Sequence, residues 1–131
     1  MEIFAAIVVG GLFVLVMSAL PEPLRQRFNA VFVGGAGAAY LNGGIGVFGM
    51  GELVFATVVA ILATVGIRRY PFIGLAWMAH VAWDIAHHLQ GEPILRFDAS
   101  SSLGCAVCDT VIAIWFFAGA PSPFAHRAPA G

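Results

Sequence analysis

The chain has 131 residues, of which 60% are hydrophobic and only 10% are charged, and its mean hydropathy is +0.93. These values lie outside the range of soluble domains and predict an integral membrane protein in which residues 1–131 form a single helical domain. Six arginines against seven carboxylates give a formal charge of −1, which excludes nucleic acid as an electrostatically favoured partner. Two cysteines are too few for a disulfide framework.

Two apolar runs occupy the N-terminal part of the chain. The first, residues 3–20, is about long enough to cross a bilayer core of roughly 30 Å and lacks the basic region of a signal peptide, so we expect a retained transmembrane helix. A short polar loop around Arg25 and Arg27 should separate it from the second run, residues 30–48, which is rich in glycine. Because glycines either let helices approach closely or interrupt them, we expect this helix to fray or kink near Asn42-Gly43-Gly44.

Three more apolar runs follow, at residues 52–67, 71–89 and 103–120. The chain is therefore expected to be all-α, a polytopic helical membrane bundle of about five transmembrane segments. With the N-terminus outside and the C-terminus in the cytoplasm, five of the six arginines lie on the cytoplasmic side, as the positive-inside rule requires. These are Arg25, Arg27, Arg68, Arg69 and Arg127.

The fourth run contains the sequence HVAWDIAHH at residues 80–88. On a helix that advances about 100° per residue, its three histidines and its aspartate fall within an arc of about 100°. Ionisable groups in a membrane helix usually face the bundle interior or a watery cavity. The pattern therefore predicts that this face lines a polar pocket.

Acidic residues of neighbouring helices are expected at the same depth as this stripe. Asp84 lies five residues from the outer end of its helix and Asp109 six residues into the next, which at ~1.5 Å per residue places both at roughly 7–9 Å. Imidazole and carboxylate ligands together suit a divalent transition metal, Zn, Fe, Mn or Cu. The candidate ligands are His80, Asp84, His87, His88, Glu52 and Asp109, and the candidate catalytic groups are Asp84, His88 and Asp109.

A CxxC motif, Cys105 to Cys108, ends one residue before Asp109. A thiol near a helix N-terminus tends to have a lowered pKa. A CxxC motif at the outer end of a small helical bundle also resembles quinone-linked thiol oxidoreductases of membranes. Two buried cysteines that pack as small apolar residues are the alternative interpretation.

Three segments in succession, HVAWDIAHH, GEPI and GCAVCDTVIAIWFFAGAP, resemble a family of small bacterial integral-membrane proteins of unassigned function. The resemblance covers roughly residues 71–121. It implies a membrane fold, here in the bacterial inner membrane, and a grouping of the histidines and aspartates, but it implies no reaction.

The leading hypothesis is a small membrane protein with a metal-binding site in its outer leaflet that acts on a lipophilic or small substrate. An open coordination position would be needed for catalysis. The alternatives are an accessory subunit of a larger membrane complex or a homo-oligomer, assembled through the glycine-rich segment 34–51, with the polar residues as interhelical hydrogen bonds. A thiol oxidoreductase or a proton relay is a third possibility.

Overall fold

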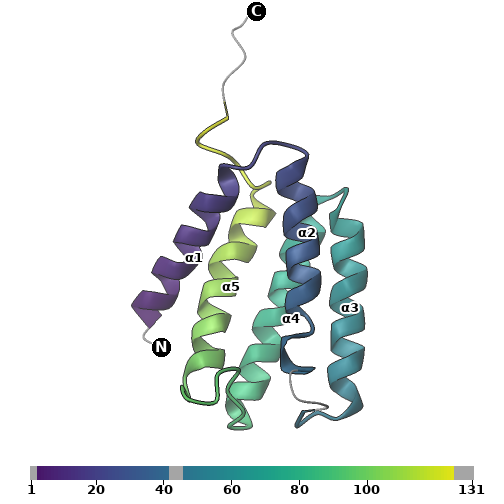
Figure 1. Cartoon of the computed structure of the whole chain (residues 1–131), viewed down its shortest axis with the longest axis vertical. Helices are drawn as coiled ribbons and strands as arrows, with labels where there is room; N and C mark the ends of the chain where they lie inside the picture. Colours follow the sequence, from purple (N-terminus) through teal and green to yellow (C-terminus); the bar gives the residue numbers. More distant parts are fainter. Residues whose placement is uncertain (1–2, 42–45, 126–131) are drawn as a thin grey trace, which may run out of the picture.

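The computed structural model describes residues 3–41 and 46–125. In this part of the chain the fold is an antiparallel helical bundle, in which successive helices run in alternate directions (Figure 1). Its elements are α1 (Ile3–Ser18), α2 (Leu24–Ala36), the 3₁₀ turn η1 (Ala39–Leu41), α3 (Met50–Gly66), α4 (Tyr70–Leu89) and α5 (Ser101–Phe117). The predicted all-α class is confirmed over these residues.

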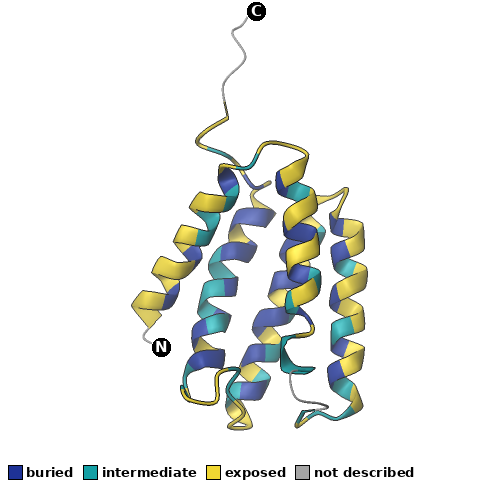
Figure 2. Cartoon of the chain, in the orientation of Figure 1, coloured by how far each residue is buried: buried dark blue, intermediate teal, exposed yellow. Residues whose placement is uncertain are grey.

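The centre of the bundle is the pair α4 and α5, which make the most extensive contact between elements. Helix α1 packs against α5, while α2 and α3 pack against each other and against α4. The inward faces are buried and the outward faces exposed, as Figure 2 shows. The apolar core includes Val59, Ile73, Trp77 and Phe116.

Helix α2 begins six residues earlier than the sequence predicts, at Leu24 rather than Ala30. The predicted polar loop is wrong, because residues 24–36 are helical and Arg25 finds partners within the chain. The buried Arg25 guanidinium donates to Glu22 at 2.7 Å and to the Ser18 carbonyl at 3.2 Å. The predicted break at Asn42-Gly43-Gly44 lies outside the described residues, and α2 has already ended at Ala36.

Among the residues that the structure describes, none of the helices combines the length and the hydropathy needed to cross a membrane. The five transmembrane segments predicted from the sequence are therefore not supported. The five helices contain 16, 13, 17, 20 and 17 residues, and α1, α2 and α5 are shorter than the apolar runs 3–20, 30–48 and 103–120 from which spans were predicted.

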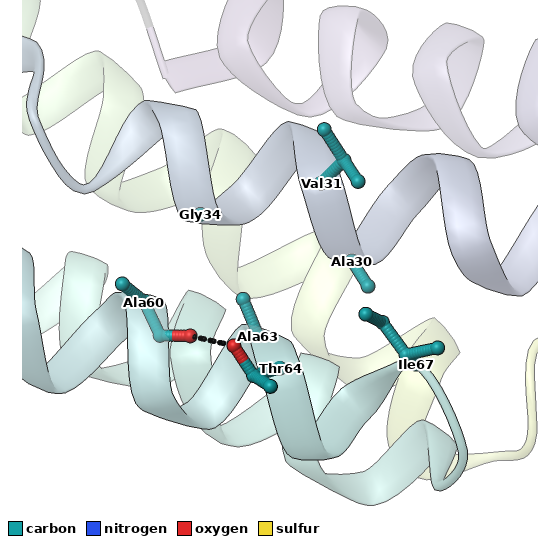
Figure 3. A pocket seen from close by; sticks show the side chains of 7 residues that line it. All are labelled: Ala30, Val31, Gly34, Ala60, Ala63, Thr64 and Ile67. Atoms are coloured by element: carbon teal, nitrogen blue, oxygen red, sulfur yellow. Dashed lines mark hydrogen bonds between the residues drawn. The ribbon is translucent and has the colours of Figure 1, made fainter.

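An open groove of about 170 Å³ lies between α2 and α3 (Figure 3). Its one hydroxyl, that of Thr64, donates to the Ala60 carbonyl at 2.8 Å and so is satisfied within α3. A Cβ added at Gly34 would lie 3.2 Å from Cβ of Ala63. Part of the glycine-rich segment thus serves close helix packing within the chain itself.

Candidate metal centre

Three buried side chains from α4 and α5 converge inside the bundle: His80, Asp84 and Asp109. The Nδ1 atom of His80 lies 3.6 Å from Oδ2 of Asp84 and 3.4 Å from Oδ2 of Asp109. One ligand atom from each residue lies within 4.8 Å of the others, so the group can hold a metal ion. His80 and Asp84 come together because residues four apart share a helix face, and Asp109 because α5 packs antiparallel against α4.

The orientation of His80 is set by its other ring nitrogen. Nε2 lies 2.6 Å from the carbonyl oxygen of Ala36, which can only accept, so Nε2 carries the hydrogen. In the neutral imidazole Nδ1 is then an unprotonated acceptor that faces two carboxylates. Within the described residues, Nδ1 of His80 and Oδ2 of Asp84 are buried without a hydrogen-bond partner. A cation or a proton is needed between these atoms, since lone pairs repel.

Asp84 is held by a hydroxyl outside its own helix. Tyr40 of η1 donates to Oδ1 of Asp84 at 2.8 Å and lies 2.7 Å from the Ser102 hydroxyl. Ser102 in turn accepts the Ile94 backbone N–H at 2.9 Å. Burial raises the pKa of Tyr40 far above its ordinary value, so its hydroxyl remains a donor.

His80 and Asp109, the other two members of the group, both have raised pKa values. Burial raises the pKa of Asp109 to about 8, an effect that His80 opposes and Asp84 reinforces. Burial lowers the pKa of His80, but the adjacent carboxylate of Asp84, the Ala36 carbonyl and the charge of Asp109 outweigh it, so the net shift is upward. Without a cation, the site therefore retains a proton near neutral pH.

Glu52 and His87, two of the predicted ligands, form a separate buried pair. Nε2 of His87 lies 2.8 Å from Oε1 of Glu52, and its Nδ1 donates to the Trp83 carbonyl at 3.0 Å. The Trp83 indole donates to Oε2 of Glu52 at 3.0 Å. Both imidazole nitrogens are thus engaged by protein atoms, and neither Glu52 nor His87 joins the His80 group.

His88 lies outside both clusters. It is half-buried, and its Nδ1 has no hydrogen-bond partner among the described residues. The metal-ligand group does not include it. Of the six predicted ligands, the structure therefore brings together three and places the other three elsewhere.

Cys105 and Cys108 are free thiols, each partly buried. Burial, reinforced by nearby carboxylates, raises the pKa of Cys105 to about 12 and that of Cys108 to about 11. The lowered pKa expected from a helix N-terminus is wrong, because desolvation and like charge outweigh the helix dipole. Both sulfurs are neutral thiols at physiological pH, the less reactive form.

Sequence reasoning missed the groups that hold the ligands. The position of Tyr40 in an apolar, glycine-rich segment could have predicted a role for its hydroxyl, because a buried tyrosine hydroxyl usually forms a hydrogen bond. Ser102 belongs to a run of three serines with nothing to distinguish it. The Ala36 carbonyl carries no signal, since every residue has one.

The fold and the site together define a class: an all-α protein with a buried histidine–carboxylate cluster of metal-ligand type. The chain belongs to a family of unknown function, DUF6010, whose family model matches residues 1–122. No curated protein and no solved structure matches it.

Proposed function

We propose that the protein binds one divalent transition-metal ion through Nδ1 of His80, Oδ2 of Asp84 and Oδ2 of Asp109. The observation that carries the proposal is the spacing of these atoms. Nitrogen and oxygen ligands at ~2.0–2.2 Å from a tetrahedral ion lie about 3.3–3.6 Å apart. The separations of Nδ1 of His80 from the two carboxylate oxygens, 3.6 and 3.4 Å, fit that geometry and exceed the usual range of hydrogen bonds.

Charge and ligand type support the same proposal. Two buried carboxylates repel each other, and a doubly charged cation between them removes the repulsion without requiring a proton. One imidazole with two carboxylates is a ligand set that suits Zn²⁺, Fe²⁺ or Mn²⁺. The hydrogen bond from Nε2 of His80 to a carbonyl is a common outer contact of a metal-ligating histidine.

Three protein ligands leave a tetrahedral ion with a fourth position for water or substrate. This is the arrangement of catalytic rather than purely structural sites, and it supports a metal-assisted reaction on a small or lipophilic molecule. In such a reaction the metal would activate a bound water, and the carboxylates would hold the ion and balance its charge.

Metal analysis of the purified protein tests the proposal. We expect about one transition-metal ion per chain in the wild type and less than about 0.2 in His80→Ala. His88→Ala is the matched control, because it removes a histidine of the same helix that lies outside the group. A wild-type content as low as that of His80→Ala, even after incubation with Zn²⁺, Fe²⁺ or Mn²⁺ and removal of excess ion, would refute metal binding.

We further propose that the outer surface of the bundle lies against lipid. Within the described helices, the charged residues of α3, α4 and α5 are the buried Glu52, Asp84 and Asp109, and α1 contains none. Many large apolar residues are exposed instead. The exposed residues lie on the outward faces of the helices in Figure 2. The exposed arginines and Glu22 and Glu92 lie at the two ends of the bundle, in the connections and the first turn of α2. An apolar belt of this extent is rare on a protein surrounded by water.

Flotation with liposomes tests this proposal. Protein diluted out of detergent into phospholipid vesicles should float with the vesicles and resist extraction with carbonate. Protein that stays monomeric and soluble after removal of detergent, without vesicles, would contradict lipid contact.

A further inference from the structure

Two of the three proposed ligands are held by one short turn. The carbonyl of Ala36, at the end of α2, accepts from Nε2 of His80 at 2.6 Å. Four residues later the Tyr40 hydroxyl donates to Asp84 at 2.8 Å. Ligands from α4 thus take their outer contacts from residues 36–40, which are the last residue of α2 and the start of its connection to α3.

The hydrogen bonds at Asp84 have one consistent direction. The Ile94 N–H donates to Ser102, whose hydroxyl hydrogen is then available for Tyr40, and Tyr40 gives its own hydrogen to Oδ1 of Asp84. This chain of donors occupies Oδ1 and leaves Oδ2, the atom near His80, without a partner among the described residues. Asp84 is therefore oriented so that one oxygen is fixed and the other faces the ion.

Packing fixes the turn in place from two sides. A Cβ added at Gly37 would lie 2.7 Å from Cγ1 of Val59, so only glycine lets the turn approach α3 this closely. On the other side the Tyr40 ring stacks on the His87 imidazole, with centroids 3.6 Å apart and planes 16° from parallel. His87 is itself held by Glu52. The Glu52–His87 pair thus supports the tyrosine that orients Asp84.

We infer that residues 36–40, together with Ser102, are the positioning element of the metal centre. Tyr40 and Ser102 act through Asp84, and the Ala36 carbonyl acts through His80, without contacting the ion. The inference rests on the proposed metal binding. Outer contacts of this kind, when removed, typically reduce metal affinity by about 10–100-fold.

The test compares Tyr40→Phe with the wild type, using Co²⁺ as a spectroscopic probe. Phenylalanine keeps the stacking on His87 and removes only the hydroxyl. We expect Co²⁺ affinity to fall about 10–100-fold and the visible ligand-field bands of Co²⁺ to shift or lose intensity. A change in general stability would not by itself alter those bands.

Two more variants complete the experiment. Tyr70→Phe is the matched control, because Tyr70 also donates to a carboxylate, that of Glu22, away from the metal centre. It should leave affinity and spectrum unchanged. Ser102→Ala leaves Tyr40 in place and should cause a smaller loss, and it serves as the second test where Tyr40→Phe fails to fold. Wild-type affinity and spectrum in folded Tyr40→Phe or in Ser102→Ala would overturn the inference, whereas absence of Co²⁺ binding to the wild type would refute metal binding itself.

Discussion

A single imidazole nitrogen decides the chemistry of this site. Nδ1 of His80 faces Asp84 and Asp109 at 3.6 and 3.4 Å, and its tautomer is set by the Ala36 carbonyl. An imidazole in the same helix, His87, has both nitrogens engaged by protein atoms at 2.8 and 3.0 Å. Two histidines seven residues apart therefore have different roles, one as a proposed ligand and one as structural support.

The raised pKa of Asp109 predicts how metal affinity depends on pH. Its value of about 8 means that the folded, metal-free protein holds a proton on this carboxyl at pH 7, and the ion must displace that proton. Apparent affinity should rise with pH up to about 8, by at most about tenfold per unit, and change less above it. Chelator competition between pH 6 and 9 measures this.

The raised pKa of Asp109 also predicts how the stability of the metal-free protein depends on pH. Because the unfolded chain releases the proton of Asp109 near its ordinary pKa, the metal-free protein should lose stability as pH rises towards 8. Bound metal should remove that loss. A metal affinity that stays constant between pH 6 and 9, or that falls as pH rises, would contradict the role given to Asp109.

At the scale of the helices, the sequence predicted those features of the site that follow from the regular spacing of residues along a helix. A spacing of 3.6 residues per turn predicts that the polar residues of 80–88 share one face of a helix. The antiparallel arrangement of neighbouring helices predicts the equal depth of Asp84 and Asp109. The start of α2 was missed because Arg25 looks like a loop residue until its partners are known. The separation of Glu52 and His87 from the site depends on side-chain orientation, which periodicity does not specify.

The turn after α2 gives the prediction at this scale. In Gly37→Ala the new methyl group overlaps Val59, so we expect a loss of about 1–3 kcal/mol in the free energy of unfolding and a weaker metal site, because the turn moves away from His80 and Asp84. Thermal unfolding and metal titration measure the two effects.

Gly35→Ala is the matched control for this substitution. A Cβ at Gly35 meets no other atom within 4 Å, and the position is helical. Alanine there should be neutral or stabilising by up to about 1 kcal/mol, with metal affinity unchanged. Equal changes in stability and metal affinity in Gly37→Ala and Gly35→Ala would contradict the claim that the position of the turn determines metal affinity.

At the scale of the whole molecule, composition and surface point the same way. The 60% of hydrophobic residues are too many for the interior of a bundle this small, so large apolar side chains remain on its outer faces, and the exposed charges collect at its ends. The sequence predicted this apolar character, but among the described residues no helix has the combination of length and hydropathy that a membrane span needs.

A lysine in the apolar belt should disturb lipid contact. Ile61 is 60% exposed in the middle of α3, and Ile61→Lys would place a charge among acyl chains at a cost of about 2–4 kcal/mol. We expect weaker vesicle binding and easier carbonate extraction. Leu95→Lys, in the connection between α4 and α5, is the control and should float like the wild type. Equal flotation of both variants would contradict a lipid-facing α3.

X-ray absorption spectroscopy of the metal-loaded protein tests the central claim most directly. The account predicts one imidazole nitrogen and carboxylate oxygens at about 2.0–2.2 Å, with no sulfur ligand, and loss of this signal in His80→Ala and Asp109→Asn. A signal from hydrated, unligated ion, a sulfur ligand from Cys105, or an unchanged spectrum in both variants would contradict it.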